Sequence, residues 1–312
     1  MTPPPDTAAG DPATGGRTAA VAPARALGLL FATGLTLGAL VPLGRIAAGA
    51  GVPAVGYMFW FALGGGAVSL AVALARGTPP PADRRHLGYY LVAGAISLAL
   101  PHSLLVVVLP HIGAGLGGML YTLPPSITYA LALAIGLERP RALRLAGLAL
   151  GLAGAVVLVG PRGTLPDPAM AGWLLLALGV PLSLAVANIY RTVAWPGETG
   201  PLPLATGMLL AAATILFAVM AATGSFYGPL PVRHAGDVAV LVQAVLAGPG
   251  YMLFFRLQQV AGPVYLSQFG YVMTAMGVAT GALVFGEIFT IWMWLALAAM
   301  AAGLALVNRQ QR

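Results

Sequence analysis

Several residue types that enzymes and soluble proteins rely on are absent or scarce in this sequence. It contains no cysteine, four histidines and eight acidic residues among 312. The absence of cysteine excludes disulfides, thiolate metal sites and a cysteine nucleophile. So few His, Asp and Glu residues give a metal site little support as well. We therefore predict a protein without a bound cofactor or metal.

Charge is also scarce, and long apolar runs take its place. Only 7% of the residues are charged, 59% are hydrophobic, and the mean hydropathy is +0.90. This composition leaves too little polar surface for a water-soluble globule of this size. The apolar runs have about 17 to 25 residues, the length of a helix that crosses roughly 30 Å of hydrocarbon. We predict an all-α integral membrane protein with ten transmembrane helices, at Leu27 to Ala48, Val55 to Ala75, Leu87 to Leu109, Gly113 to Ile135, Leu143 to Val159, Ala169 to Tyr190, Leu204 to Ala222, Val238 to Leu257, Val264 to Phe285 and Ile288 to Val307.

The fifteen basic residues are all arginine, and their positions predict the orientation of the chain. Short loops rich in Arg stay on the cytoplasmic side of a membrane. With the N-terminus inside, twelve arginines, Arg191 among them, fall on the cytoplasmic side, and only Arg45, Arg162 and Arg233 fall outside. We therefore predict a multi-pass inner (cytoplasmic) membrane protein with both termini cytoplasmic. The net charge of +7 then reflects topology in a lipid bilayer and indicates no nucleic-acid partner.

Two glutamates suggest that the chain is duplicated. Glu138 closes the apolar run "AIGLERPRA", and Glu287, 149 residues later, closes "ALVFGEIFT". A shift of 149 residues also brings five apolar runs of each half into register. Five crossings per half invert the second half relative to the first, a plan that recurs in secondary transporters. We predict a disordered cytoplasmic tail over residues 1–25, a first five-helix repeat over 26–160, a linker over 161–168, a second repeat over 169–308 and a cytoplasmic C-terminal tail over 309–312.

The two halves carry a resemblance to a known family. In each half the fourth helix ends in a glutamate motif, "GLERP" or "FGEIFT", and an Ala/Gly-rich fifth helix follows. This pattern resembles the drug/metabolite transporter superfamily of the EamA type. The resemblance implies a ten-helix carrier for small metabolites such as amino acids or nucleosides. It also implies that the third, fourth, eighth and ninth helices line a central cavity, while the fifth and tenth pack behind it.

The sequence departs from that family at two places. Many relatives carry an arginine at the start of the second helix, where this chain has "GYMFWF" with Trp60. Prolines common in the middle of the fourth and ninth helices occur only in the first half, as Pro124 and Pro125, and Met273 stands at the equivalent of Pro124. The substrate of a particular relative therefore does not transfer to this chain.

Polar residues at helical spacing predict a substrate cavity between the repeats. In the fourth helix Thr122, Ser126 and Tyr129 share one face, and in the ninth Ser267, Tyr271 and Thr274 do the same. These side chains either hydrogen-bond a small substrate or bond to their own backbone and to neighbouring helices. Trp60 either faces this cavity or lies in an interfacial belt. The candidate cavity residues are Trp60, His102, Tyr121, Thr122, Ser126, Ser267, Gln268, Tyr271 and Thr274.

Prolines inside the apolar runs mark candidate hinges, because their rings remove a backbone hydrogen bond. Pro101 precedes His102 in "LALPHSLL", and Pro249 takes nearly the equivalent place in the second half. Pro42 and Pro181 interrupt the first and sixth helices. His102 either binds substrate or carries a proton, or it is an ordinary interhelical hydrogen-bond partner.

Three charged residues have two interpretations each. Glu138 and Glu287 are either carboxylates at a helix N-terminus or gates linked to proton movement. Arg139, Arg141 or Arg144 is a plausible partner for Glu138. Arg45 either contacts an anionic group of the substrate or extends to the outer headgroups.

We expect a secondary, cofactor-free transporter of a small polar metabolite. Export or exchange of amino acids or related compounds by alternating access at the repeat interface fits best. An intramembrane enzyme using His102 with Ser97 or Ser103 is one alternative, and a membrane scaffold or channel subunit is another. The partners expected are a small-molecule substrate and lipid, with the protein a monomer or a homodimer.

Overall fold

The computed structural model describes residues 23–105, 107–108, 120–159, 168–286 and 291–308. Within these ranges the protein is all-helical, with no strand. Six helical stretches of the described chain are long and apolar enough to cross a membrane, which indicates a multi-pass membrane protein. The expected number of ten crossings stays a prediction. The six stretches are Ala24–Gly49, Ala54–Ala75, Arg84–Leu105, Leu175–Val193, Pro201–Thr223 and Ala235–Ser267.

The first apolar run is divided in two by a proline. Helix α1 covers Pro23–Gly38 and α2 covers Leu40–Gly49, with the break at Ala39. Pro42 has no N–H to offer four residues back, and its ring clashes with the carbonyl of Gly38. The helix therefore ends one turn before the proline.

The sixth run breaks in the same way. Helix α8 covers Pro168–Ala177 and α9 covers Gly179–Val193, and Leu178 separates them. Pro181 stands three residues after this break, as Pro42 does after Ala39. The same steric conflict, here with the carbonyl of Ala177, explains the position of the break.

The other two prolines behave differently. Helix α4, Arg84–Gly94, continues through a π-helical turn, η1, at Ala95–Ala99, and Pro101 stands two residues after this turn. A wider turn absorbs the missing hydrogen bond without ending the helix. Helix α11, Ala235–Ser267, runs through Pro249 without a break, contrary to our expectation, and leaves helical geometry only at Gly262. Gly262 has a φ of 78°, a left-handed value that glycine adopts without steric cost.

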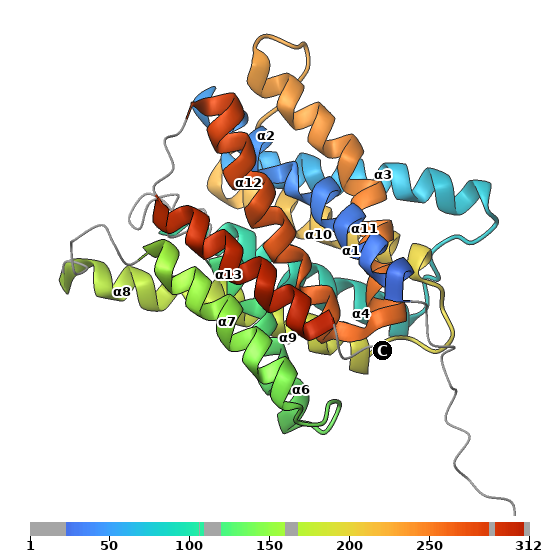
Figure 1. The fold of residues 1–312 in the computed structure, drawn as a ribbon. Coiled ribbons are helices and arrows are strands. Elements are labelled where there is room, and N and C mark those ends of the chain that lie inside the picture. The colour runs from blue at the N-terminus through green and yellow to red at the C-terminus, as the bar shows by residue number, and fades with distance from the viewer. Residues whose placement is uncertain (1–22, 106, 109–119, 160–167, 287–290, 309–312) are drawn as a thin grey trace, which may run out of the picture.

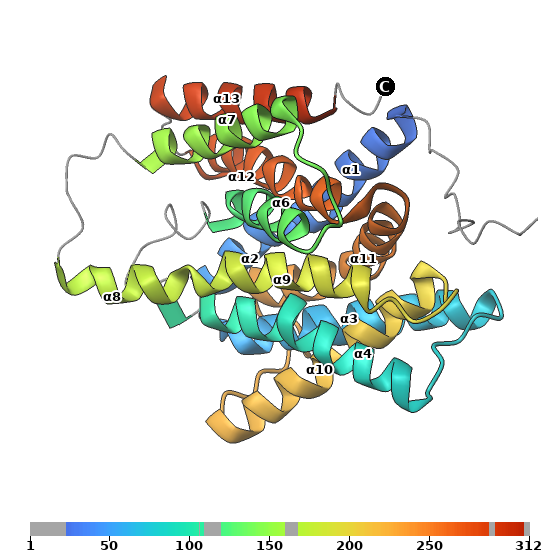
Figure 2. The same ribbon diagram turned by 90° about the horizontal axis from the view of Figure 1, so that it is seen from below.

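The remaining helices cover the rest of the described chain. Helix α7 packs along α13, and Figures 1 and 2 show the two side by side. Their contact depends on glycine, because a Cβ at Gly303 would stand 2.5 Å from the carbonyl oxygen of Gly147. These elements are α3 (Ala54–Ala75), the short 3-10 helix η2 (Leu120–Thr122), α6 (Pro124–Ala134), α7 (Ala142–Val159), α10 (Pro201–Thr223), α12 (Phe269–Phe285) and α13 (Ile291–Asn308).

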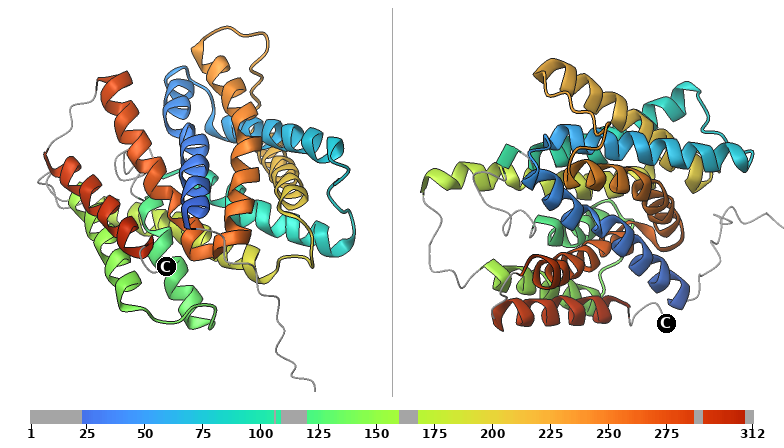
Figure 3. Two further views of the ribbon diagram at one scale, coloured as in Figure 1. Left: turned by 45° about the vertical axis from the view of Figure 1, so that its right-hand side comes forward. Right: turned by 90° about the horizontal axis from the view of Figure 1, so that it is seen from above.

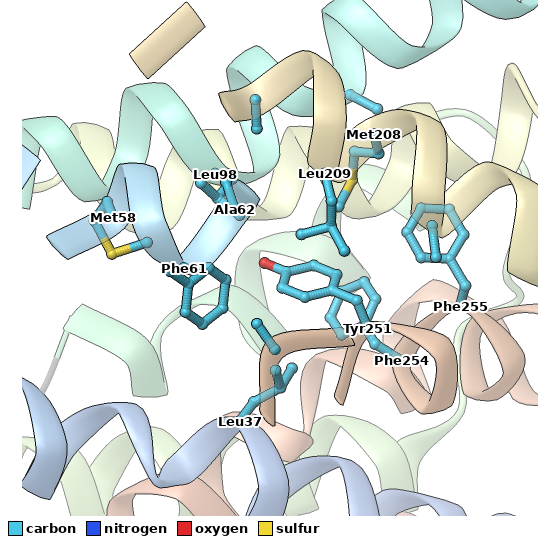
Figure 4. Packing of buried hydrophobic residues seen from close by; sticks show 14 of the residues in the cluster. Leu37, Met58, Phe61, Ala62, Leu98, Met208, Leu209, Tyr251, Phe254 and Phe255 are labelled. Carbon is cyan, nitrogen blue, oxygen red and sulfur yellow. The ribbon is translucent and has the colours of Figure 1, made fainter. Parts of the chain in front are cut away.

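The helices form three layers. The pair α7 and α13 lies on one side, α3, α4 and α10 lie on the other, and α1, α6, α11 and α12 run between them (Figures 2 and 3). Helix α3 packs against both α10 and α11. The largest buried cluster lies where these helices meet, and Figure 4 shows Phe61, Met208, Leu209 and Phe255 within it. The core therefore lies between the middle layer and the layer of α3, α4 and α10.

Candidate functional site

A cavity lies in the interior where the middle helices meet, with a volume of about 50 Å³. Its walls come from α1, α2, α3, α6, α9, α11 and α12, together with η1, η2 and the residue after Pro101. The cavity thus collects side chains from both halves of the sequence. The lining residues are Leu37, Leu40, Phe61, Ser97, His102, Tyr121, Pro124, Leu184, Asn188, Arg191, Tyr251, Phe254, Ser267, Phe269, Gly270 and Met273.

Arg191 is the charged residue of this cavity. From the sequence we placed Arg191 in a loop on the cytoplasmic side, and the placement in a loop was wrong. The residue lies in the last turn of α9, and its side chain is 1% exposed. The side chain is long enough to carry a charge from the end of a helix into the protein interior, so position in the sequence alone does not reveal its direction.

Three neutral acceptors hold the guanidinium. Its Nε donates to Oε1 of Gln258 at 2.8 Å, one terminal nitrogen donates to Oδ1 of Asn188 at 2.5 Å, and the other donates to Oγ of Ser97. The carbon of the guanidinium lies 4.8 Å from the centre of the Phe254 ring, close enough for a cation–π interaction. Residues from α9, α11 and η1 therefore fix the orientation of this charge.

A second set of hydrogen bonds fixes the acceptors. Nε2 of Gln258 donates to the backbone oxygen of Asn188 at 2.8 Å and to Oγ1 of Thr192 at 2.9 Å. Nδ2 of Asn188 donates to Oγ1 of Thr128 on α6 at 3.3 Å. Because each amide donates elsewhere through its nitrogen, its oxygen is left to accept from Arg191.

Aromatic rings form an apolar wall beside the charge. The ring centres of Phe61 and Tyr251 are 5.9 Å apart, those of Tyr251 and Phe254 are 5.3 Å apart, and those of Phe254 and Phe269 are 5.3 Å apart. Figure 4 shows Phe61, Tyr251 and Phe254 grouped around Leu37. The cavity therefore presents one charged, hydrogen-bonding end and one aromatic face.

His102 and Tyr121 add polar groups at the wall. Nδ1 of His102 lies 2.9 Å from the backbone oxygen of Leu98, and since a carbonyl only accepts, Nδ1 is the donor. Nε2 is then left to interact with a ligand. The hydroxyl of Tyr121 is buried and has no hydrogen-bond partner among the described residues. The two rings lie near one another, with centres 6.1 Å apart.

Of the predicted cavity residues, His102, Tyr121 and Ser267 line the cavity. The hydroxyl of Ser267 also donates to the backbone oxygen of Val264 at 2.7 Å. Tyr271 points toward α7, since a Cβ at Gly151 would stand 2.6 Å from its hydroxyl. The structure thus brings together part of the predicted set.

The other predicted residues lie outside the lining. Thr274 donates to the backbone oxygen of Gly270 at 2.9 Å, and Trp60 donates through its indole nitrogen to the backbone oxygen of Tyr227 at 2.8 Å. Thr122, Ser126 and Gln268 are wholly or largely buried beside the cavity and are not part of its wall. The side-chain amide of Gln268 has no hydrogen-bond partner among the described residues.

The charged candidates lie away from the cavity. Glu138 forms an ion pair with Arg144 at 2.6 Å, as the sequence suggested. The guanidinium of Arg45 lies 4.3 Å from the centre of the Phe285 ring. Glu287 lies outside the described residues.

Most residues at the charged end of the cavity were not predicted from the sequence. Asn188, Arg191 and Gln258 were not among its candidates, although Asn188 and Arg191 stand three residues apart at the end of an apolar run. That spacing places both on one helical face, and polar residues on one face of a membrane helix point to a functional site. This signal was present in the sequence.

Comparison with known proteins identifies a family for the first part of the chain. Residues 24–160 belong to the EamA-like transporter family. This match confirms the resemblance to the drug/metabolite transporter superfamily and indicates an EamA-type membrane transporter with a small-molecule substrate. No curated protein matches this chain.

A solved structure supports the fold of the chain. It is titled "Crystal structure of protein" and matches with a TM-score of 0.73 at 20% sequence identity. The match covers 91% of this chain and 98% of the other. At this identity the likeness supports a shared fold and does not extend to a substrate.

Proposed function

We propose that the protein is a cofactor-free secondary transporter that exports or exchanges a small polar metabolite across the inner membrane. The observation that carries this proposal is the cavity built by helices from both halves of the chain. Secondary transporters place their substrate between two repeats, where rocking of one repeat against the other alternates access to the two sides.

The pairing of helices supports an inverted repeat. In the predicted order, α1 and α9 are equivalent, as are α6 and α12, α3 and α10, and α7 and α13. Helix α1 packs against α12, and its equivalent α9 packs against α6. Helix α3 packs against α10, and α7 packs against α13, so equivalent helices also pair with each other. A twofold relation between the halves produces such reciprocal pairs.

The broken helices support a hinge function. The first run of each half breaks three residues before its proline, at Ala39 before Pro42 and at Leu178 before Pro181. The two breaks do not coincide under the 149-residue shift, but each gives the first run of its half a point at which to bend when access alternates. We assign the hinge role to these two prolines and to the π-helical turn before Pro101.

An enzymatic function is less well supported. His102 donates to a backbone oxygen, and Ser97 accepts from Arg191. Within the described chain no hydrogen bond joins His102 to Ser97 or Ser103, so a base and nucleophile pair is not assembled. Membrane scaffolding stays an outcome of the experiment below.

Counterflow in proteoliposomes tests the proposal. Proteoliposomes that contain the purified protein are loaded with unlabelled metabolites, including amino acids and organic acids. Uptake of the same compounds in labelled form is then measured. We expect saturable exchange of at least one compound. Leu184→Trp fills the cavity wall and should reduce this exchange at least about tenfold, because a carrier needs the space.

A matched substitution on the same helix serves as the control. Leu182 lies two residues away and is 51% exposed, so Leu182→Trp adds the same ring outside the cavity and should leave exchange near the wild-type rate. A folded protein that exchanges no compound of the panel, or equal losses in both variants, would count against a carrier with this cavity as its substrate site.

A further inference from the structure

Arg191 presents an unusual combination of burial and charge. Its side chain is 1% exposed, yet its three protein partners are all neutral. Burying an ionised group without an opposite charge is costly, so buried arginines normally pair with a carboxylate. The described structure raises the question of which negative charge balances this one.

The acidic residues of the described chain do not supply it. Asp83 binds His86, Glu138 binds Arg144, and Asp237 accepts from Tyr227. Glu198 is exposed in the loop between α9 and α10. Among the described residues, therefore, the wall of the cavity contains a cation and no carboxylate.

The guanidinium retains donors for a ligand. An arginine carries five N–H groups, and three of them serve Gln258, Asn188 and Ser97. One N–H on each terminal nitrogen is left over. Both lie in the plane of the guanidinium, from which N–H groups can donate to the oxygens of a carboxylate.

We propose that the cavity binds a monocarboxylate, with its two oxygens on the free N–H groups of Arg191 and its apolar part against the aromatic wall. This inference deepens the proposed function in that it takes the cavity as the substrate site. The ligand supplies the negative charge that the described protein residues do not.

The balance of charge favours a monocarboxylate over a phosphate or a zwitterion. A single guanidinium neutralises one negative charge, so a phosphate dianion would leave one charge buried without a partner. A zwitterion would bring an ammonium group, and the described wall offers it no carboxylate. Phe61, Tyr251 and Phe254 instead present rings that suit an apolar or aromatic body.

Ligand binding to the purified protein tests this inference without requiring transport. The thermal stability of the protein in detergent is measured as each ligand is titrated. The ligands are butyrate, benzoate and phenylacetate and, separately, butyramide, benzamide and phenylacetamide. Each amide has nearly the shape of its acid and lacks the charge. We expect at least one acid to bind at least about tenfold more tightly than its amide.

Two variants and a control assign the effect to Arg191. Arg191→Gln removes the charge and should abolish the preference for the acid, while Arg191→Lys retains the charge without the planar guanidinium and should keep part of it. Arg256→Gln removes an exposed arginine of α11 that bonds to Gln259, and it should bind like wild type. The comparison of acid with amide in the wild-type protein stands even where a variant does not fold.

The outcomes separate this inference from the proposed function. Equal binding of acids and amides to the wild-type protein, or no binding of either, overturns the carboxylate site. Inorganic phosphate and phenylalanine are titrated in the same way. Tighter binding of either one than of the monocarboxylates overturns the carboxylate site as well. Counterflow of neutral metabolites would then still support a transporter. Conversely, binding of acids that depends on Arg191 supports the site even where counterflow fails.

Discussion

At the scale of residues, the structure concentrates its buried polarity around one guanidinium. Gln258 serves Arg191, the backbone of Asn188 and the hydroxyl of Thr192 at the same time. Buried polar networks stabilise a fold when all their members are satisfied and destabilise it when one member is removed. Gln258 is therefore a structural support for the charge, whereas Arg191 faces the ligand.

Replacing Gln258 tests this support. Gln258→Leu leaves a buried N–H of Arg191 without its acceptor and the backbone oxygen of Asn188 without its donor from Gln258. We expect a loss of about 1–3 kcal/mol in unfolding free energy. Gln259→Leu offers the control, because Gln259 is the next residue of α11 and is exposed. Thermal unfolding in detergent compares the two, and equal stabilities would contradict the role of Gln258.

At the scale of elements, prolines and glycines decide where helices end and how closely they approach. The breaks at Ala39 and Leu178 follow from prolines three residues later, and the kink in α11 occurs at a glycine with positive φ. The contact of α7 with α13 depends on Gly303 lying against Gly147. Backbone chemistry thus shapes this bundle as much as side-chain packing does.

A pair of glycine substitutions tests the role of close packing. In Gly303→Ala the added Cβ collides with the backbone of α7, and overpacking of this kind costs about 1–3 kcal/mol. A Cβ at Gly28 on α1 meets nothing within 4 Å. Gly28→Ala should therefore be neutral or stabilise the helix by up to about 1 kcal/mol. Thermal unfolding of both variants decides, and a neutral Gly303→Ala would contradict the tight contact.

Much at this scale was predictable from the sequence, because apolar length and proline chemistry are local properties. The runs over 55–75 and 204–222 match α3 and α10 closely. Pro249 was harder to predict, since a proline ends a helix or is accommodated depending on what packs around it. The site was predicted only in part, because its residues are brought together by packing and not by local sequence. His102, Tyr121 and Ser267 line the cavity, but the partners of Arg191 come from helices far apart in sequence.

At the scale of the whole molecule, the absence of cysteine allows a clean test of orientation. Ala82 lies in the loop between α3 and α4, which we predict to be cytoplasmic, and Val232 lies in the loop between α10 and α11, which we predict to be outside. Both side chains are exposed. Single cysteines placed there are the only thiols in the protein.

Labelling of intact cells with a membrane-impermeant maleimide reads out the orientation. Val232→Cys should react directly, and Ala82→Cys should react only after the membrane is opened. The reverse pattern would invert the predicted topology, and equal reaction of both in intact cells would mean that the two loops face the same side. The positive-inside distribution of arginine predicts the first result.

The buried guanidinium also has an electrical consequence. Under the two proposals above, the empty cavity carries a positive charge and the loaded cavity is neutral. A membrane potential then acts on the reorientation of the empty protein and not on that of the loaded one. One elementary charge that crosses 100 mV changes the free energy by about 2.3 kcal/mol. Exchange of one carboxylate for another would thus be insensitive to voltage, whereas net export would be driven or slowed by it.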